Sequence, residues 1–231
     1  MSKDAERWRV PDLVPNGVEL CAIFVGESPH KDELKPEKKV ERSPFRGSAG
    51  RRWWQEIFGC AGLQLQNDAQ VPPKAELEYV CHKLRIAVLN AIQYPIDPRI
   101  TKHYPACVPR EYLKFDKGTR DRNGNGKGPF GYKTVFDDQD CTDPVGEAIM
   151  DLARRLKFFS NMPAQIVCLG NDSQWFVRQA IRRLPAGCAL WGQEPVTIPH
   201  PARWRFSSKL LSKNFRADAV HTLKQFIEPV S

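Results

Sequence analysis

Four short apolar segments, separated by stretches with helical periodicity, constrain the fold of this chain more than any other feature. They are strand-length, rich in β-branched residues, and lie at Leu20–Val25, Arg85–Leu89, Gln165–Leu169 and Pro195–Ile198. Such runs are typical of strands buried on both faces of a mostly parallel sheet. Because helical patterns lie between them, we expect a three-layer α/β/α domain with a central, mostly parallel four-stranded sheet.

The helical patterns have clear start signals. Asp143 and Pro144 predict the start of one helix, and Asn171 to Ser173 offer caps for the next. Further helices are predicted from Ala49 through Phe58 and near the end of the printed sequence. The segment at about 102–140 is rich in glycine and basic residues and shows neither the helical nor the strand period, so we expect it to be a surface insertion. The whole chain, residues 1–231, is expected to form a single domain.

Composition narrows the class of protein. The chain has 231 residues, of which 41% are hydrophobic and 10% aromatic, which excludes a wholly disordered chain. The longest apolar run is far shorter than the roughly 20 residues of a membrane-spanning helix. Seven widely spaced cysteines and a charged N-terminal segment favour reduced thiols in the cytoplasm, and no CxxC pair indicates a zinc or iron–sulfur site.

The charge balance indicates the kind of partner. Lysine and arginine number 35 against 27 aspartates and glutamates, which leaves a net charge of +8. A basic surface of this size favours polyanions, among which nucleic acids are the most common. A merely soluble basic protein is the alternative that charge alone leaves open.

Polar side chains follow the apolar runs where each predicted strand ends. Glu27 lies just beyond the first run, Asn90 just beyond the second and His200 just beyond the fourth. In an open α/β sheet, ligands bind outside the carboxyl ends of the strands. A carboxylate, an amide and an imidazole are therefore expected at one edge of the sheet, and this predicts a functional site there.

The residues at these strand ends resemble motifs of the uracil-DNA glycosylase superfamily, and most closely its family-four type. The resemblance runs in family order from Leu20 to about Leu210, apart from the insertion. It rests on five motifs: Gly26-Glu27-Ser28-Pro29, Pro44-Phe45-Arg46-Gly47-Ser48-Ala49-Gly50, Leu89-Asn90, Cys168-Leu169-Gly170 and His200-Pro201.

The resemblance implies a monofunctional DNA glycosylase that hydrolyses the N-glycosidic bond of a flipped-out pyrimidine and leaves an abasic site. The base would be uracil or a modified pyrimidine. Glu27 would orient or deprotonate the attacking water. His200 would donate a hydrogen bond to the oxyanion that develops on the leaving base. This chemistry requires neither a metal nor another cofactor.

The same resemblance implies four residues that bind the extruded base. Phe45 would stack on the pyrimidine ring, and Asn90 would read its polar edge with one donor and one acceptor. Ser28 would place a backbone N–H near the oxyanion. His30 stands where well-known branches have glycine or tyrosine, so it would alter the pocket wall beside the base.

A second set of residues is expected to contact DNA, single- or double-stranded, in a protein that acts as a monomer without a membrane. The stretch after His200-Pro201 is basic and aromatic, and the family uses this loop to enter the minor groove. Arginines at a presumed helix start are suited to phosphate. The expected DNA-binding residues are Arg51, Arg52, Arg203, Trp204 and Arg205.

The sequence departs from the family-four pattern and leaves other functions open. Gln93 stands in the region where that type carries a cluster-binding cysteine, so no iron–sulfur cluster is predicted. An altered pocket favours, as one alternative, excision of hydroxymethylated or glucosylated cytosine-type bases from phage DNA as a defence. A non-catalytic nucleic-acid-binding module is a second alternative. A metal-dependent nuclease that uses His30, Asp32 and Glu33 ranks last, because three ligands within four residues make a poor site.

Overall fold

The protein is built on one parallel sheet covered by helices on both faces. The computed structural model describes residues 8–65, 71–95, 144–205 and 215–227, and the predicted insertion at about 102–140 lies outside them. The elements in chain order are β1 (Ala22–Gly26), α2 (Lys31–Leu34), η1 (Lys39–Glu41), α3 (Ser48–Cys60), α4 (Lys74–Lys83), β2 (Ile86–Asn90), α6 (Pro144–Lys157), β3 (Gln165–Leu169), α7 (Asn171–Ile181), β4 (Val196–Ile198), η5 (Pro201–Arg205) and α8 (Phe215–Phe226).

The four strands run in the order β2-β1-β3-β4, and every neighbouring pair is parallel. The register places Gly26 of β1 beside Asn90 of β2, and Val25 beside Cys168 of β3. An N-terminal segment adds an isolated antiparallel bridge between Leu13 and Val88 at the outer side of β2. The predicted four-stranded parallel sheet is thereby confirmed.

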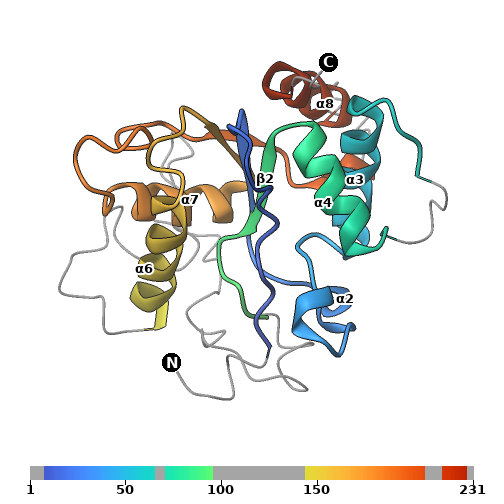
Figure 1. Cartoon of the computed structure of the whole chain (residues 1–231), viewed down its shortest axis with the longest axis horizontal. Coiled ribbons are helices and arrows are strands. Elements are labelled where there is room, and N and C mark those ends of the chain that lie inside the picture. The colour runs from blue at the N-terminus through green and yellow to red at the C-terminus, as the bar shows by residue number, and fades with distance from the viewer. Residues whose placement is uncertain (1–7, 66–70, 96–143, 206–214, 228–231) are drawn as a thin grey trace.

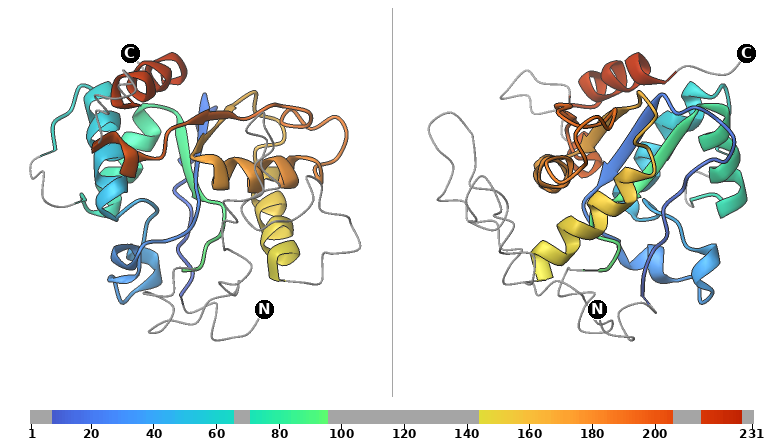
Figure 2. Two further views of the ribbon diagram at one scale, coloured as in Figure 1. Left: turned by 180° about the vertical axis from the view of Figure 1, so that it is seen from behind. Right: turned by 60° about the vertical axis from the view of Figure 1, so that its left-hand side comes forward.

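Side chains alternate between two cores, one on each face of the sheet. Ile23 and Val25 pack into the core under α6 and α7, whereas Ala22 and Phe24 pack into the core under α3, α4 and α8. Figure 1 shows these two groups of helices on opposite sides of the strands, and Figure 2 shows the same separation from two other directions. The three-layer α/β/α architecture follows from strands that are apolar at most positions and so bury side chains on both faces of the sheet.

The strand order creates a switch point at the carboxyl end of β1. From β1 the chain crosses to β2 on one side, and β3 then returns to the other side of β1. Right-handed crossovers in opposite directions place their helices on opposite faces, which explains why α3 and α4 are separated from α6. Ligands of open α/β sheets bind at such a point, outside the strand ends. The residues that follow Gly26 occupy this position.

The element boundaries differ from the predictions in informative places. β1 and β2 extend to Gly26 and Asn90, because backbone pairing continues after the apolar run has ended. Helices α2 and α4 were not predicted. α4 buries only Leu77, Val80 and Cys81, so most of its residues are polar and its periodicity is weak.

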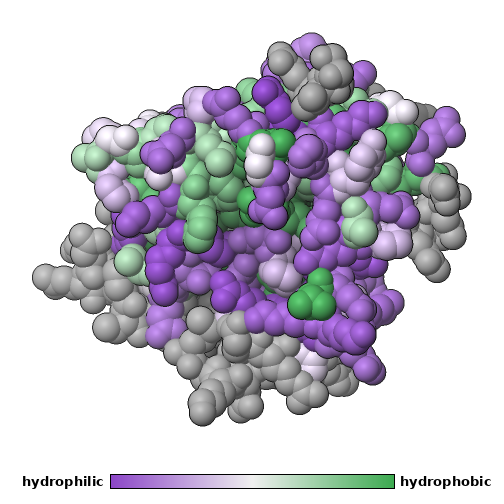
Figure 3. All heavy atoms as spheres, viewed as in Figure 1, coloured by the Kyte–Doolittle hydropathy of each residue, from purple (hydrophilic) through white to green (hydrophobic). Residues whose placement is uncertain are grey.

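The surface is mostly hydrophilic on the side seen in Figure 3, and a hydrophobic area lies around the end of α6. Phe158, just after α6, is 86% exposed, and Trp191, in the segment after α7, is 53% exposed. Among the residues that the structure describes, no helix is long and apolar enough to cross a membrane.

Candidate active site

Two side chains named by the sequence motifs converge on Gly26, at the end of β1. A Cβ atom added to Gly26 would lie 2.3 Å from Cε1 of Phe45 and 3.3 Å from Oδ1 of Asn90. The phenyl ring and the amide therefore approach the strand end from two different segments. Only a residue without a side chain leaves room for both of them.

Phe45 is held in an unusual backbone conformation. Its φ is 65°, in the left-handed region that non-glycine residues rarely adopt. The ring is 7% exposed and packs edge-on against Trp53, with centroids 5.1 Å apart. Strain of this kind persists where surrounding packing enforces it, and it concentrates at functional sites.

Asn90 is buried and paired with a carboxyl group that the sequence analysis considered only for the nuclease alternative. Its Nδ2 donates to Oε2 of Glu33 over 2.8 Å, and both residues are at most 3% exposed. Glu33 also accepts hydrogen bonds from the backbone N–H groups of His30 and Phe45. This one carboxyl thus connects the end of β2 to the two segments that carry His30 and Phe45.

Burial governs the protonation of Glu33. Removal from water raises its pKa from 4.5 to about 8, although hydrogen bonds from His30, Asn90 and Phe45 and the charge of Arg46 act in the opposite direction. Burial therefore favours the protonated form of this carboxyl, whereas the N–H groups that donate to both of its oxygens favour the carboxylate.

The contact of Glu33 with Asn90 is the main feature of this strand end that the sequence analysis missed. Glu33 lies in a charged stretch, and a glutamate in such a stretch is usually solvated. One signal was present: Glu33 stands three residues after His30, and the two form a capping box at the start of α2. That pattern fixes the carboxyl near the backbone but does not show that it is buried.

Glu27 and Ser28 lie directly after β1, at the switch point of the sheet. Both are partly exposed. The Glu27 carbonyl accepts a hydrogen bond from Ile92 N–H over 2.9 Å, and the Gly26 carbonyl accepts one from Ala91 N–H over 2.8 Å. The backbone that carries the Glu27 carboxylate is thus bonded to the loop that follows Asn90.

His200 lies beside the neighbouring strand end. Its Cβ is 3.3 Å from the position of a Cβ added at Gly170, which follows β3 and has a φ of 101°. Its Nδ1 accepts a hydrogen bond from the backbone N–H of Ala202 over 3.2 Å. That bond places the proton of the neutral ring on Nε2, so Nε2 is the donor.

His30 serves mainly as the cap of α2. Its Nδ1 accepts from Asp32 N–H over 3.3 Å, and its ring covers Gly47, where an added Cβ would be 2.7 Å away. Asp32 lies beside the ring and is paired with Lys35, whereas Glu33 turns inward to Asn90. In the described ranges, no group of three His, Cys, Asp or Glu side chains could hold a metal ion. The geometry thus gives no support to the nuclease alternative.

The residues expected to contact DNA lie near one another, on α3 and η5. Arg51 and Arg52 are partly exposed, and Arg52 donates to the carbonyl of Pro201 over 3.2 Å. The side chains of Arg203 and Arg205 lie outside the described part of the structure.

Trp204 occupies a different position from the one expected. It is 7% exposed, belongs to the core under α3 and α8, and donates from Nε1 to the carbonyl of Pro199 over 2.9 Å. A wedge between DNA bases needs an exposed apolar side chain. This placement gives Trp204 a packing role beneath the loop that carries His200, and the geometry lends no support to a DNA contact.

Comparison with known proteins adds no assignment. The chain matches no family model and no curated protein. The geometry of the strand ends therefore carries the functional argument.

Proposed function

We propose that the protein is a monofunctional DNA glycosylase of the uracil-DNA glycosylase type, which hydrolyses the N-glycosidic bond of a flipped-out pyrimidine. One observation carries the proposal. The Phe45 ring, the Asn90 amide and, through that amide, the Glu33 carboxyl meet at Gly26, one residue before Glu27. An aromatic ring beside a buried amide is chemistry that suits the recognition of a single nucleobase.

The polar pair suits the edge of a pyrimidine. An amide supplies both a donor and an acceptor, and the Glu33 carboxyl holds this amide in one orientation. The Asn90 amide can therefore match the carbonyl and N3–H of uracil, or the amine and N3 of a cytosine-type base. This supports pyrimidine as the substrate class and keeps the phage-base alternative within the same proposal.

The remaining residues suit the cleavage step. The bond between C1′ of the sugar and N1 of the base breaks, its electron pair leaves with the base, and water adds to C1′. Glu27 orients that water and takes up its proton. His200 donates from Nε2 to the oxyanion that forms on the base, and loss of one such donor typically costs about 10²–10³ in rate.

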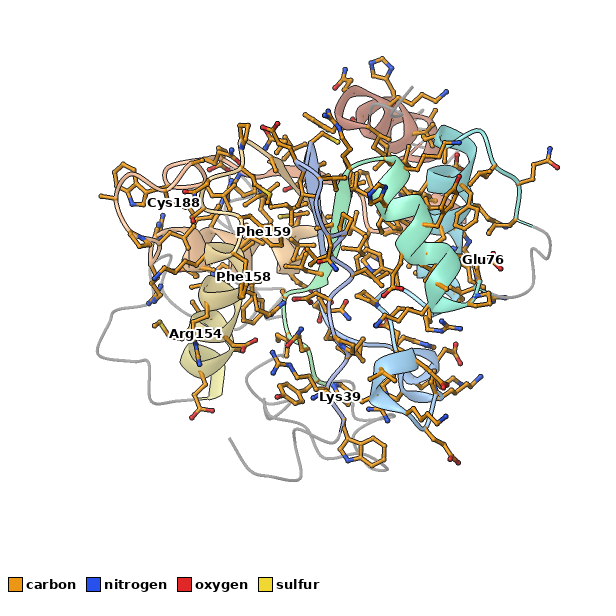
Figure 4. The ribbon with its side chains drawn as sticks, viewed as in Figure 1. Lys39, Glu76, Arg154, Phe158, Phe159 and Cys188 are labelled. Carbon is orange, nitrogen blue, oxygen red and sulfur yellow. The ribbon has the colours of Figure 1, made fainter. Side chains whose placement is uncertain are left out.

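The proposal is tested by incubating the protein with duplex and single-stranded DNA that contains uracil, thymine, hydroxymethylcytosine or glucosylated hydroxymethylcytosine. Alkaline cleavage reports abasic sites, and mass spectrometry identifies the freed base. Glu27→Gln and Asn90→Ala are expected to lower excision by at least about 10²-fold, whereas DNA affinity is retained. Glu76→Gln, an exposed change on α4, is the matched control and should excise at the wild-type rate (Figure 4).

The outcomes separate the competing functions. Release of a base by wild type and its loss in Glu27→Gln support the glycosylase. DNA binding without release of any base favours the non-catalytic module. Equal excision by wild type, Glu27→Gln and Asn90→Ala would show that the site lies elsewhere.

A further inference from the structure

An arginine of α6, on the face of the sheet away from α3, binds the backbone at the end of β2. Arg155 of α6 donates from Nη1 to the carbonyl of Asn90 over 2.9 Å and from Nη2 to the carbonyl of Ala91 over 2.8 Å. Its side chain is only 10% exposed. A buried guanidinium that binds two successive carbonyls fixes the path of the chain at that point.

Two carboxylates hold this guanidinium in place. Asp151, one helical turn earlier on α6, accepts from Nε over 2.9 Å. Asp12 of the N-terminal segment accepts from Nη1 with both oxygens at 3.2 Å. Burial raises the pKa of Asp12, and the charge of Arg155 is the largest influence that opposes this rise. The planar fork of an arginine serves all four acceptor groups, which a lysine ammonium cannot do.

The contacts of Arg155 with these carbonyls and carboxylates are part of a closed ring of polar contacts. Gln93 donates to Asp12 over 2.9 Å and accepts from Arg9, and Arg9 in turn lies 3.8 Å from Asp151. The ring therefore joins three separate segments: the N-terminal segment, the loop after β2, and α6. Partly buried networks of this kind hold one arrangement of the backbone when all of their members are satisfied.

The Asn90 and Ala91 carbonyls that Arg155 binds are directly coupled to the proposed active site. Asn90 carries the amide that meets Phe45 at Gly26. The N–H groups of Ala91 and Ile92 donate to the carbonyls of Gly26 and Glu27. A shift of the backbone at Asn90 would therefore move the base-reading amide and the Glu27 carboxylate together.

We propose that Arg155 is a positioning residue for base excision, which sets the Asn90 amide and the Glu27 carboxylate relative to the extruded nucleotide by binding the Asn90 and Ala91 carbonyls. This inference rests on the proposed function. Its effect is on geometry, and misplacement by about 1 Å at a reacting centre can cost about 10²-fold in rate.

The test compares Arg155→Lys with Arg154→Lys. Arg154 is the neighbouring, exposed residue of the same helix, and it donates to the carbonyl of Met150 in its own helix (Figure 4). Single-turnover excision, DNA affinity and the side-chain amide NMR signals of Asn90 are measured for each. Arg155→Lys should lower the excision rate about 10- to 100-fold, change DNA affinity less than about threefold, and shift the Asn90 amide signals. Arg154→Lys should change none of the three.

A second variant keeps the test valid if Arg155→Lys folds poorly. Asp151→Asn removes one charged support of the guanidinium and leaves Arg155 in place. It should cause a smaller loss of excision and a smaller shift of the same amide signals. Circular dichroism and thermal unfolding report the folded fraction of each variant.

The two proposals fail in different ways. If wild type releases no base from any of the DNA substrates, the glycosylase proposal fails, and the Asn90 amide signals still test the positioning role. If Arg155→Lys lowers thermal stability but leaves those signals and the excision rate within about twofold of wild type, Arg155 only stabilises the fold. That result overturns the inference.

Discussion

At the scale of single residues, the pairing of Glu33 with Asn90 is the most unusual feature of the protein. A carboxyl buried this deeply would cost several kcal/mol if it were ionised and unpaired. Three N–H donors surround it, and its pKa of about 8 shows that desolvation still dominates. The fold therefore keeps the Glu33 carboxyl of α2 beside Asn90, at the end of β2, at the expense of stability.

The raised pKa predicts how stability depends on pH. The unfolded chain ionises Glu33 near its ordinary pKa of 4.5, whereas the folded chain does so near 8. The stabilising effect of the bound proton is therefore complete below pH 4.5 and is lost as the pH rises through about 8.

Glu33→Gln removes this titration. In urea unfolding, the stability of wild type relative to Glu33→Gln should fall between about pH 5 and about pH 9, by an amount on the order of a few kcal/mol. The exposed substitution Glu76→Gln controls for the loss of a carboxylate. If wild type and Glu33→Gln differ in free energy of unfolding by the same amount at pH 5 and pH 9, Glu33 titrates at its ordinary pKa and the prediction is wrong.

The sequence could predict some of these residues and not others. Asn90 and Phe45 stand in short motifs whose order along the chain is informative. Glu33 and Arg155 stand among other charged residues, and such residues are usually solvated. Their roles depend on burial and on contacts across 57 and 65 residues of chain, respectively, and local patterns do not encode these.

At the scale of elements, the contact between α3 and the segment before it decides the position of Phe45. A Cβ added at Gly50 would lie 2.0 Å from the Phe45 carbonyl oxygen, so the helix touches the backbone of that residue. No side chain fits in this space. The close approach helps to enforce the left-handed conformation of Phe45.

Two glycines of α3 provide a matched pair of tests. Gly50→Ala should destabilise the protein by about 1–3 kcal/mol because its methyl group overlaps backbone that cannot move aside. Gly59→Ala places its methyl group in open space in the same helix and should stabilise by up to about 1 kcal/mol. Urea unfolding measures both. Equal effects of the two substitutions would contradict the close packing of α3 on Phe45.

How well each helix or strand could be predicted from the sequence depends on how much of its surface is buried. β1 and β2 were evident from sequence because both of their faces are covered, which leaves nearly continuous apolar runs. α6 was evident from its apolar stripe. α4 was not, because a helix that covers one edge of a core needs few apolar residues.

At the scale of the whole molecule, the net charge of +8 is the property most relevant to a DNA substrate. The DNA backbone holds condensed counterions, and a protein that neutralises phosphates releases them. Binding to DNA should therefore depend on salt even if base recognition does not.

The proposed function predicts a steep dependence of DNA affinity on salt. If roughly four phosphates are neutralised, affinity should fall about 100-fold between 50 and 200 mM salt. Fluorescence anisotropy with a labelled duplex measures this change, and a short neutral peptide nucleic acid serves as the uncharged control. Affinity that is unaffected by salt would argue against recognition through the phosphate backbone.

The two outer edges of the sheet determine how readily further strands can pair with it. Along the outer side of β2, Leu13 exchanges hydrogen bonds with Val88 in both directions, and Val10 donates to the carbonyl of Gln93. The opposite rim, β4, is only three residues long. Unsatisfied strand edges recruit further strands and lead to fibres, and covered or shortened edges prevent this. Among the described residues, one edge of the sheet is therefore covered by its own chain and the other offers only a short strand for pairing.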